Sequence, residues 1–441
     1  MESSLSESVQ QLVRPGKCVD VYYPDPQTAE KQCFRTTINT RYTQDFTNLG
    51  GGTSVFTIPP NNGIQDIVVA MTLPALSAFP AGSAAGYNLC RGWAYALIKQ
   101  ISFRYAGSSQ YFLTGQQVLQ TALSMASDSG SRDALLTLGG NIALGNAGFT
   151  ASPASGYVWL PLPHCIPSAE GKLPPLPSDL LTQQIQVTVE LFPLSKIFSL
   201  GTGATLGGIP ASLSAAKFQV QQVILENQGD ALARRVDMTS HALSYPINFR
   251  QQEVTIQLNG GQSLNPGASQ VVTLTGFRQG ECREIHAWLT ADSVNTPTPA
   301  TPGASATVIQ NPFAWYALND VEMTYAGEVY ARFDANSGQL WNLINGRIPT
   351  QVNDALLTGS GGTVSAPSPT ADSWSVLPFA QSYDAPTAHS MYMAGKSITN
   401  GLVNLKFTIP PTAVASTYTL HISYVYNAVL TFSQGTCDYV F

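Results

Sequence analysis

Charged side chains are scarce in this chain. Asp, Glu, Lys and Arg make up only 11% of its 441 residues, whereas soluble domains usually carry about 25%. The 44% hydrophobic and 10% aromatic content excludes a disordered chain. The low charge argues against a helical protein, because the solvent faces of helices are normally rich in Glu, Lys and Arg. The surface must therefore be covered by small polar residues, which suits strands and turns, or by partner subunits.

The chain also lacks a basic excess, a long apolar run and an Asn-x-Ser/Thr glycosylation site. A net charge of −6 gives no means of displacing phosphate counterions, and we interpret the densest basic spot, Arg234–Arg235, as a solvated turn between domains. No apolar run reaches the roughly 18 residues that a membrane span needs, and the segment Met1–Val9 is too polar and acidic for a signal peptide. We expect no sequence-specific nucleic acid, no transmembrane segment and no secretion.

Cysteine is too sparse to define a disulfide framework. The six cysteines are scattered along a chain that is long enough to build a core without disulfides. We expect most of them to be reduced and buried, and a Cys18–Cys33 bridge stays open as an alternative. Their positions are Cys18, Cys33, Cys90, Cys165, Cys282 and Cys437.

Turn signals and short strand-forming runs alternate along the chain. Asn-Gly pairs, which suit tight turns, occur at 62–63, 259–260, 345–346 and 400–401. Many short strands at such spacing indicate a sandwich or a barrel. The β-branched and aromatic runs that predict strands are 54–59, 64–73, 185–192, 218–225, 253–258, 271–275 and 418–426.

Two segments predict helices. The first is Thr114–Met125, where Thr114 and Gln117 form a capping-box pattern ahead of an apolar stripe. The second is Ser337–Ile344, which ends at Asn345-Gly346.

An internal repeat is the most informative feature. Ile98–Gly107 matches Leu318–Gly327 at an offset of 220, and in both copies the inward residues alternate with period two, ending at Tyr105 and Tyr325. A predicted helix follows each copy. Three further matches lie in the same order along the chain: 38–41 with 247–250, 66–71 with 284–289, and 173–175 with 409–411.

This collinear order predicts one domain that is duplicated, with a boundary near 230–240. We predict an all-β chain of two tandem eight-stranded jelly-roll β-sandwiches, with one short inserted helix in each. The predicted limits are an N-terminal arm at 1–35, a first jelly roll at 36–235 and a second at 236–441.

A search for reactive groups gives no convincing catalytic, cofactor-binding or metal site. Gly395-Lys396-Ser397 lacks the first glycine of a phosphate-binding loop, and Gly201–Gly208 has the wrong spacing for a dinucleotide loop. Asp320 and Glu322 lie two apart on one strand, about 7 Å by strand rise, but a polar outer face explains them. We interpret His164-Cys165 as a surface histidine beside a core cysteine, and Tyr22-Tyr23 as packing residues. We therefore predict no enzyme and no cofactor.

Several segments resemble a known family. Phe56–Val68, Gly92–Tyr111 with its helix Gly115–Ala126, and Arg132–Gly140 resemble the first jelly roll of double jelly-roll major capsid proteins of the hexon-like lineage. The similarity is to virophages, polinton-like viruses and related small double-stranded DNA viruses of eukaryotes. The local motifs cover about residues 35–140, and the duplication extends the likeness over nearly the whole chain.

The resemblance implies a viral major capsid protein. It implies a homotrimer with two jelly rolls per chain, and hence a pseudo-hexameric capsomer that tiles an icosahedral shell. Its partners would be itself, neighbouring capsomers, and penton and minor capsid proteins. Its place would be the virion, after synthesis in the host cytoplasm or nucleus. The sparse charge agrees, because charged residues are depleted in the cores of interfaces.

Two other classes stay open. A lectin-like β-sandwich on a surface or spike protein would need a cluster of aromatic residues and carboxylates at one loop end. A β-rich hydrolase would need paired carboxylates in a groove.

Overall fold

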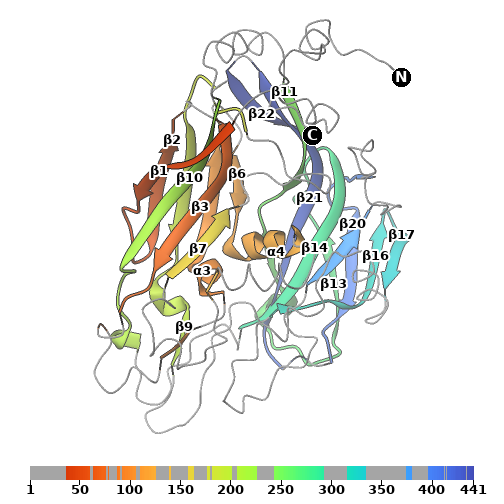
Figure 1. The fold of residues 1–441 in the computed structure, drawn as a ribbon. Helices are drawn as coiled ribbons and strands as arrows, with labels where there is room; N and C mark the ends of the chain where they lie inside the picture. Colours follow the sequence, from red (N-terminus) through yellow and green to blue (C-terminus); the bar gives the residue numbers. More distant parts are fainter. Residues whose placement is uncertain are drawn as a thin grey trace, which may run out of the picture.

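The computed structural model describes residues 36–59, 63–75, 78, 87–89, 92–105, 110–125, 139–140, 157–162, 176–178, 181–200, 206–225, 243–292, 315–333, 374–379, 396–411, 413, 415–433 and 435–441. Antiparallel strands dominate this part of the chain, and they gather into two units that lie side by side (Figure 1). We call them the first sandwich, built from residues 36–225, and the second sandwich, built from residues 243–440.

The first sandwich has two four-stranded sheets, of order β1-β10-β3-β7 and β2-β8-β5-β6, beside a small β4-β9 pair. Two short α-helices, α3 (Trp93–Leu97) and α4 (Gly115–Met125), interrupt the strands. The strands are β1 (Thr36–Asp45), β2 (Gly52–Ile58), β3 (Gly63–Thr72), β4 (Tyr87–Leu89), β5 (Ile98–Arg104), β6 (Gln110–Leu113), β7 (Tyr157–Leu162), β8 (Ile185–Leu191), β9 (Phe198–Leu200) and β10 (Ala215–Leu225).

The second sandwich has one larger sheet and one four-stranded sheet. The larger sheet is centred on β21 and β14. Strands β11 and β12 pair with β21, strands β15, β18 and β19 pair with β14, and β22 forms a hairpin with β21. The other sheet has the order β13-β20-β16-β17. The strands are β11 (Leu243–Arg250), β12 (Val254–Gln257), β13 (Ser269–Leu274), β14 (Glu281–Ala291), β15 (Trp315–Tyr316), β16 (Asn319–Tyr325), β17 (Glu328–Phe333), β18 (Ser375–Pro378), β19 (Lys396–Ser397), β20 (Val403–Thr408), β21 (Tyr418–Ser433) and β22 (Thr436–Val440).

The two sandwiches share one topology. When the eight core strands of each are numbered along the chain, the two sheets read 1-8-3-6 and 2-7-4-5 in both units. In the first sandwich these strands are β1, β2, β3, β5, β6, β7, β8 and β10; in the second they are β11, β13, β14, β16, β17, β18, β20 and β21. Two such sheets face to face form a jelly roll, and the predicted all-β pair of jelly rolls is confirmed.

The agreement extends to the pairing of single residues. Phe103 pairs with Val187 and Tyr111 in the first sandwich, and its counterpart Met323 pairs with Leu405 and Ala331 in the second. A β-bulge recurs at the same place, because the ladder skips Gln65 in β3 and Arg283 in β14. Bulges are local features of a fold, so a shared bulge supports the duplication strongly.

Two of the sequence matches need correction. The register aligns Ile409–Pro411, which follows β20, with Leu191–Pro193, which begins at the last residue of the equivalent strand β8. The match to 173–175 was therefore wrong. A pair of prolines can follow any strand, so it does not identify which strand is equivalent to which. The match of 38–41 with 247–250 joins equivalent strands, but a bulge at Arg41 shifts it, so that Thr40 occupies the place of Arg250.

The predicted elements are otherwise found where they were expected. All seven predicted strand runs overlap strands, and Thr114–Met125 forms α4, but the sequence patterns did not predict α3. The second predicted helix, 337–344, lies outside the described residues. The domain boundary near 230–240 falls in 226–242, also outside them, so the proposed domain limits stay a prediction.

Each core lies between its two sheets. In the first sandwich, Phe56 of β2 stacks on Phe218 of β10 with ring centroids 4.4 Å apart, and both side chains are buried. Burial of one such ring stabilises the fold by about 1.5–3 kcal/mol. Tyr105 is buried, with 1% of its surface exposed, and its counterpart Tyr325 is half-buried and packs against the buried cluster. Both tyrosines therefore face inward as predicted, but Tyr325 is less fully covered.

Candidate functional site

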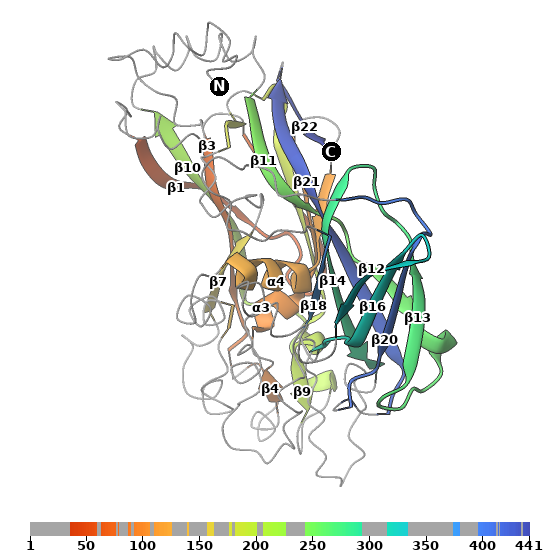
Figure 2. The ribbon, with the colours of Figure 1, turned by 90° about the vertical axis from the view of Figure 1, so that its right-hand side faces the viewer.

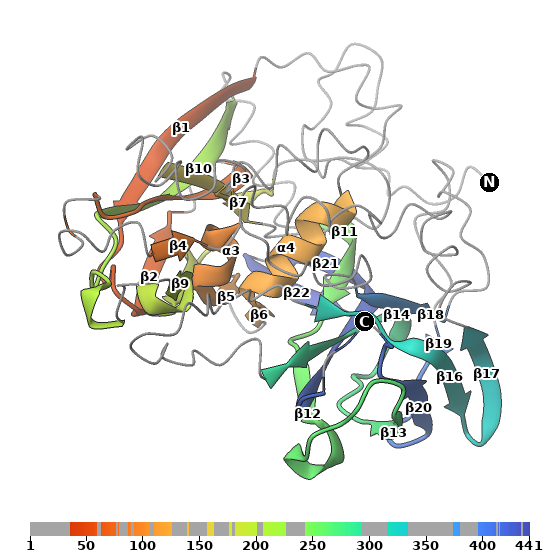
Figure 3. The same ribbon diagram turned by 90° about the horizontal axis from the view of Figure 1, so that it is seen from below.

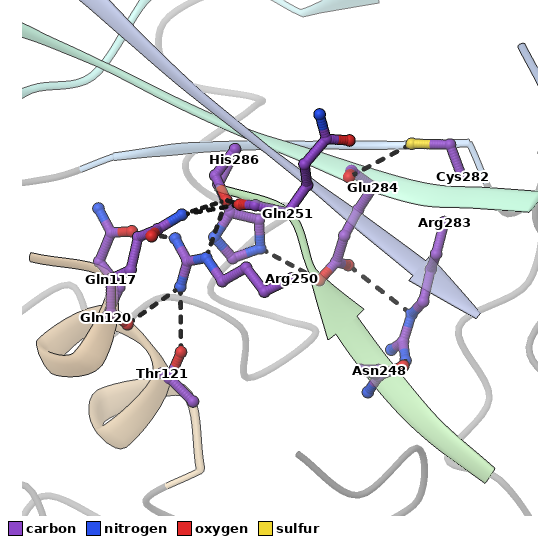
Figure 4. Close-up of polar contacts among 11 residues, drawn as sticks. Gln117, Gln120, Thr121, Asn248, Arg250, Gln251, Cys282, Arg283, Glu284 and His286 are labelled. Atoms are coloured by element: carbon purple, nitrogen blue, oxygen red, sulfur yellow. Dashed lines mark hydrogen bonds and ion pairs between the residues drawn. The ribbon is translucent and has the colours of Figure 1, made fainter. Parts of the chain in front are cut away.

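The largest concentration of buried polar side chains lies where the two sandwiches meet. The helix α4 of the first sandwich lies against the larger sheet of the second, as the views in Figure 2 and Figure 3 show. Side chains from β11, β14 and β21 meet α4 there (Figure 4). We call this contact the junction and treat it as the candidate functional site.

The start of α4 is fixed by its own sequence. The backbone N–H of Thr114 donates to Gln117 Oε1 at 3.0 Å, and the backbone N–H of Gln117 donates to Thr114 Oγ1 at 3.2 Å. These two bonds are the predicted capping box, which satisfies N–H groups that a helix leaves unpaired at its start. The cap also anchors α4 across the junction, because Thr114 Oγ1 donates to Glu253 Oε2 at 3.1 Å.

Gln117 extends the contact into the second sandwich. It is fully buried, and its Nε2 donates to Ser423 Oγ at 2.8 Å and to the carbonyl oxygen of Gln251 at 3.0 Å. Trp288 adds a bond from the other side, because its Nε1 donates to Gln116 Oε1 at 3.1 Å. One helical turn therefore contacts three segments of the second sandwich through directional bonds.

Arg250 is the buried cation of the junction. It donates to Ser423 Oγ at 3.0 Å, to Thr121 Oγ1 at 3.2 Å and to the carbonyl oxygen of Gln117 at 3.3 Å, and it also donates to Gln120 Oε1. Burial lowers the pKa of the guanidinium to about 10, although Glu253 and Glu284 act in the opposite direction. A buried charge needs such a complete set of partners, because an unpaired one is very costly.

Two histidine–glutamate pairs flank this cation. His421 Nδ1 bonds Glu253 Oε1, His421 Nε2 lies 2.7 Å from Thr290 Oγ1, and the Trp288 ring stacks on the imidazole at 5.3 Å. His286 Nε2 lies 3.1 Å from Glu284 Oε1. The first pair reaches α4 through the bond from Thr114 to Glu253, so it forms part of the contact between the sandwiches.

Aromatic rings extend the junction toward the C-terminal hairpin. Tyr111 of the first sandwich lies 5.2 Å from Phe249 and 6.2 Å from Tyr439 of the second, and Tyr105 meets Tyr439 edge-on at 6.1 Å. The guanidinium of Arg278 lies 5.0 Å from the centre of the Phe249 ring. Aromatic pairs of this kind add about 0.5–1.5 kcal/mol beyond the area that they bury.

The geometry of the junction suits a fixed contact between the two sandwiches. Its polar groups bond one another across the contact instead of facing an open cleft. Within the described ranges, no group of three or more His, Cys, Asp or Glu side chains could hold a metal ion.

The groups that the sequence analysis weighed as reactive lie elsewhere. Asp320 accepts a bond from Thr408 Oγ1 at 3.1 Å, and Glu322 lies 3.8 Å from Arg332, in an open surface depression on β16 and β20. Asp320 has a positive φ of 47° at a bulge that precedes Glu322, and both carboxylates line the same depression.

Lys396 has a packing role. Its ammonium lies 4.2 Å from the Tyr325 ring centre and 4.4 Å from that of Tyr330, and Lys396–Ser397 is a strand that pairs with β14. Lys396–Ser397 therefore lies in a strand and not in a turn between a strand and a helix, which is where a phosphate-binding loop stands.

Of the six cysteines, only Cys282 and Cys437 lie in the described residues. Cys282 and Cys437 are buried free thiols, as predicted, and burial raises the pKa of Cys282. Cys18, Cys33, Cys90 and Cys165 lie outside the described residues, as do Tyr22-Tyr23, His164-Cys165 and Arg234–Arg235.

The capping box was predictable from the sequence, but the junction to which it contributes was not. One signal was present, because Gly115–Met125 contains no charged residue. A helix that faces water on one side normally carries charge there. The run of buried polar residues Gln117, Gln120 and Thr121 therefore indicates a helix covered on both sides.

Comparison with known proteins gives matches in structure but not in sequence. No protein-family model and no curated protein matches the chain. The crystal structure of the PBCV-1 protein Vp54, as fitted into a reconstruction of the virophage Sputnik, matches with a TM-score of 0.62 at 14% identity, over 93% of this chain and 98% of that one. The Sputnik virophage structure matches with a TM-score of 0.54 at 12% identity, over 100% of this chain and 93% of that one. The mavirus major capsid protein matches with a TM-score of 0.51 at 10% identity, over 100% of this chain and 95% of that one. The chain has the double jelly-roll fold.

These matches cover nearly the whole chain and therefore both sandwiches. The expected likeness to double jelly-roll major capsid proteins is confirmed at the level of the fold. In the described part of the chain, neither helix is long and apolar enough to cross a membrane.

Proposed function

We propose that this chain is a viral major capsid protein that assembles as a homotrimer. The observation that carries the proposal is the match of nearly the whole chain, both sandwiches included, to structures from viral capsids. Three chains with two sandwiches each give six similar units, and six similar units give a pseudo-hexagonal outline that can tile an icosahedral shell.

The build of the chain supports this role. A fixed junction holds the two sandwiches of one chain together, as a tile of constant shape requires. The 11% charge content suits surfaces that become buried between subunits. We propose the limits 36–235 and 236–441 for the two jelly rolls, with 1–35 as an N-terminal arm.

The partners and location follow from the same proposal. The protein would contact itself, neighbouring capsomers, and penton and minor capsid proteins, and it would reside in the virion after synthesis in the host cytoplasm or nucleus. We propose a structural role without catalysis, since the structural matches are capsid proteins and the junction consists of mutually bonded groups.

The mass of the purified protein tests the proposal. We expect light scattering at micromolar concentration to give three times the 47.0 kDa of one chain, and negative-stain microscopy to show three-fold capsomers or shells. Obligate interfaces of this kind bury about 2,000 Å² or more, so the trimer should survive dilution. A stable monomer at micromolar concentration would contradict the proposal.

A further inference from the structure

Two Asn-Gly pairs of the second sandwich stand in exposed turns. Asn259-Gly260 belongs to the short turn Leu258–Gly261 between β12 and β13, and Asn400-Gly401 belongs to the turn between β19 and β20. Both asparagines are exposed, and a Cβ placed on either glycine would meet no described atom within 4 Å beyond its chain neighbours. Access to water therefore does not distinguish the two pairs. The pairs at 62–63 and 345–346 include residues outside the described ranges.

Hydrogen bonds hold both the side chain and the backbone of Asn400-Gly401. The backbone N–H of Phe277 donates to Asn400 Oδ1 at 2.7 Å, and Asn400 Nδ2 donates to the carbonyl oxygen of Phe277 at 3.1 Å. The backbone N–H of Gly401 donates to the carbonyl oxygen of Leu274 at 3.3 Å. Phe277 is 6% exposed and Leu274 is fully buried, so the partners that hold this turn are themselves fixed in the core.

The side chain of Asn259 is not held in this way. Its amide group forms no hydrogen bond within the described residues. The backbone N–H of Gln262 donates to the carbonyl oxygen of Asn259 at 3.2 Å, but this bond engages only the main chain. Asn259 also has φ 47° and ψ 34°, in the left-handed region that residues other than glycine seldom occupy. Rotation of its backbone therefore does not have to leave a preferred helical or extended state.

The turn that contains Asn259 is fixed at both ends and open between them. Leu258 is 2% exposed, and Leu264 exchanges two backbone hydrogen bonds with Ser416, at 2.8 and 3.2 Å. Residues 259–263 can therefore change conformation while β12 keeps its pairing with β21 and β13 keeps its pairing with β20.

We propose that Asn259-Gly260 is a site of spontaneous deamidation in the native protein and that the fold protects Asn400-Gly401 from the same reaction. Hydroxide removes the proton of the Gly260 backbone nitrogen, and this nitrogen attacks Cγ of Asn259. The new N–Cγ bond closes a succinimide ring, and the bond from Cγ to the amide nitrogen breaks, so that ammonia leaves with a proton from water. Water then opens the ring at either carbonyl and gives aspartate or isoaspartate.

The structure explains why the two pairs should react at different rates. Glycine favours the attack in both, because it has no side chain to obstruct its nitrogen and permits the backbone rotation that the ring requires. At Asn400, the attacked amide and the attacking nitrogen are both held by hydrogen bonds that must open first. Since each bond adds to the cost of opening, we expect deamidation at Asn259 to be faster by about tenfold or more.

The product would change the surface of the second sandwich. The net charge of the chain is −6, and each event makes it one unit more negative by creating an exposed carboxylate at position 259. Purified protein should therefore separate with time into charge forms that share one fold. This inference goes beyond the proposed capsid role and does not depend on it.

The rates at the two sites test the proposal without any substitution. Full-length native protein is kept in mildly alkaline buffer, and peptide mapping by mass spectrometry follows the exchange of an amide NH2 for OH at each asparagine separately. Asn259→Asp supplies the reference peptide for the aspartate product. We expect modified Asn259 to accumulate about tenfold or more faster than modified Asn400, as the three bonds of the protected pair imply.

The same measurement in urea shows whether the fold causes the difference. Both asparagines precede glycine, so the two rates should approach each other once the chain is unfolded. Equal rates in the native protein, or no reaction at Asn259, would overturn the inference. A difference that persists unchanged in urea would overturn it as well, because local sequence would then explain the rates. None of these results bears on the capsid proposal, which the mass of the assembly tests.

Discussion

Arg250 shows how much of the junction depends on one side chain. It is 2% exposed, and its guanidinium bonds four acceptors on α4 and β21. We predict that Arg250→Ala lowers the free energy of unfolding by about 3 kcal/mol, because the substitution leaves buried acceptors without donors. Urea unfolding followed by tryptophan fluorescence measures the change.

Arg332 provides the control for that prediction. Its side chain is 79% exposed, and it lies 3.8 Å from Glu322. Exposed ion pairs contribute little, so Arg332→Ala should cost less than about 0.5 kcal/mol. If both variants lost the same free energy of unfolding, the buried bonds of Arg250 would not stabilise the junction.

The matched tyrosines give a second prediction. Tyr105→Asp should lower the free energy of unfolding by about 3–5 kcal/mol, because it buries an unpaired carboxylate. Tyr325→Asp should cost clearly less, since the position is half-buried and the Lys396 ammonium, 4.2 Å from the ring, can pair with a carboxylate. Thermal melts of both variants decide the order, and a larger loss for Tyr325→Asp would refute it.

These residues also show what the sequence can and cannot predict about single side chains. Alternation of apolar residues correctly placed Tyr105 and Tyr325 on the same strand face. It could not give their different burial, because that difference comes from Tyr439, which meets Tyr105 from the far end of the chain. Arg250 presents the same difficulty, since a cation at the end of a strand has the sequence pattern of a surface residue.

At the scale of elements, α4 joins a local signal to a long-range contact. Its capping box was predictable because both partners lie within three residues of each other. Its bond to Glu253 spans 139 residues and has no local signature. The strands behave similarly: their existence followed from composition and turns, but the bulges at Arg41, Gln65 and Arg283 did not, because each depends on the facing strand.

A prediction for this element uses Thr114. Thr114→Ala removes both the cap and the bond to Glu253, so we expect a loss of about 1–2 kcal/mol. Thr114→Ser keeps the hydroxyl and should stay within about 0.5 kcal/mol of the wild type. Chemical denaturation with circular dichroism measures both. If the two variants lose the same amount, the methyl group and not the hydroxyl is responsible.

At the scale of the whole molecule, the junction decides whether two similar sandwiches behave as one body. Each sandwich has its own two sheets with buried residues between them, so each could unfold separately if the contact between them were weak, but the buried cluster continues from one sandwich into the other. The contact between them is buried and polar, and Gln117, Arg250 and Ser423 bond one another across it. Gln116, Gln117, Gln120 and Thr121 of α4 each form at least one hydrogen bond to the other sandwich, which couples the two.

We therefore predict that the protein unfolds in one calorimetric transition, with the calorimetric and van't Hoff enthalpies in agreement for the unfolding unit. Combining Gln117→Ala with Arg250→Ala should remove the buried bonds that these two side chains make and split the transition into two, one for each sandwich. Arg332→Ala with Gln186→Ala, two exposed positions away from the junction, should leave a single peak. If the junction double variant also melts in one transition, the contacts that remain couple the sandwiches: the bonds of Thr114 and Trp288 and the aromatic contacts of Tyr105, Tyr111 and Tyr439. Those contacts, rather than the buried bonds of Gln117 and Arg250, then make the chain a single rigid unit.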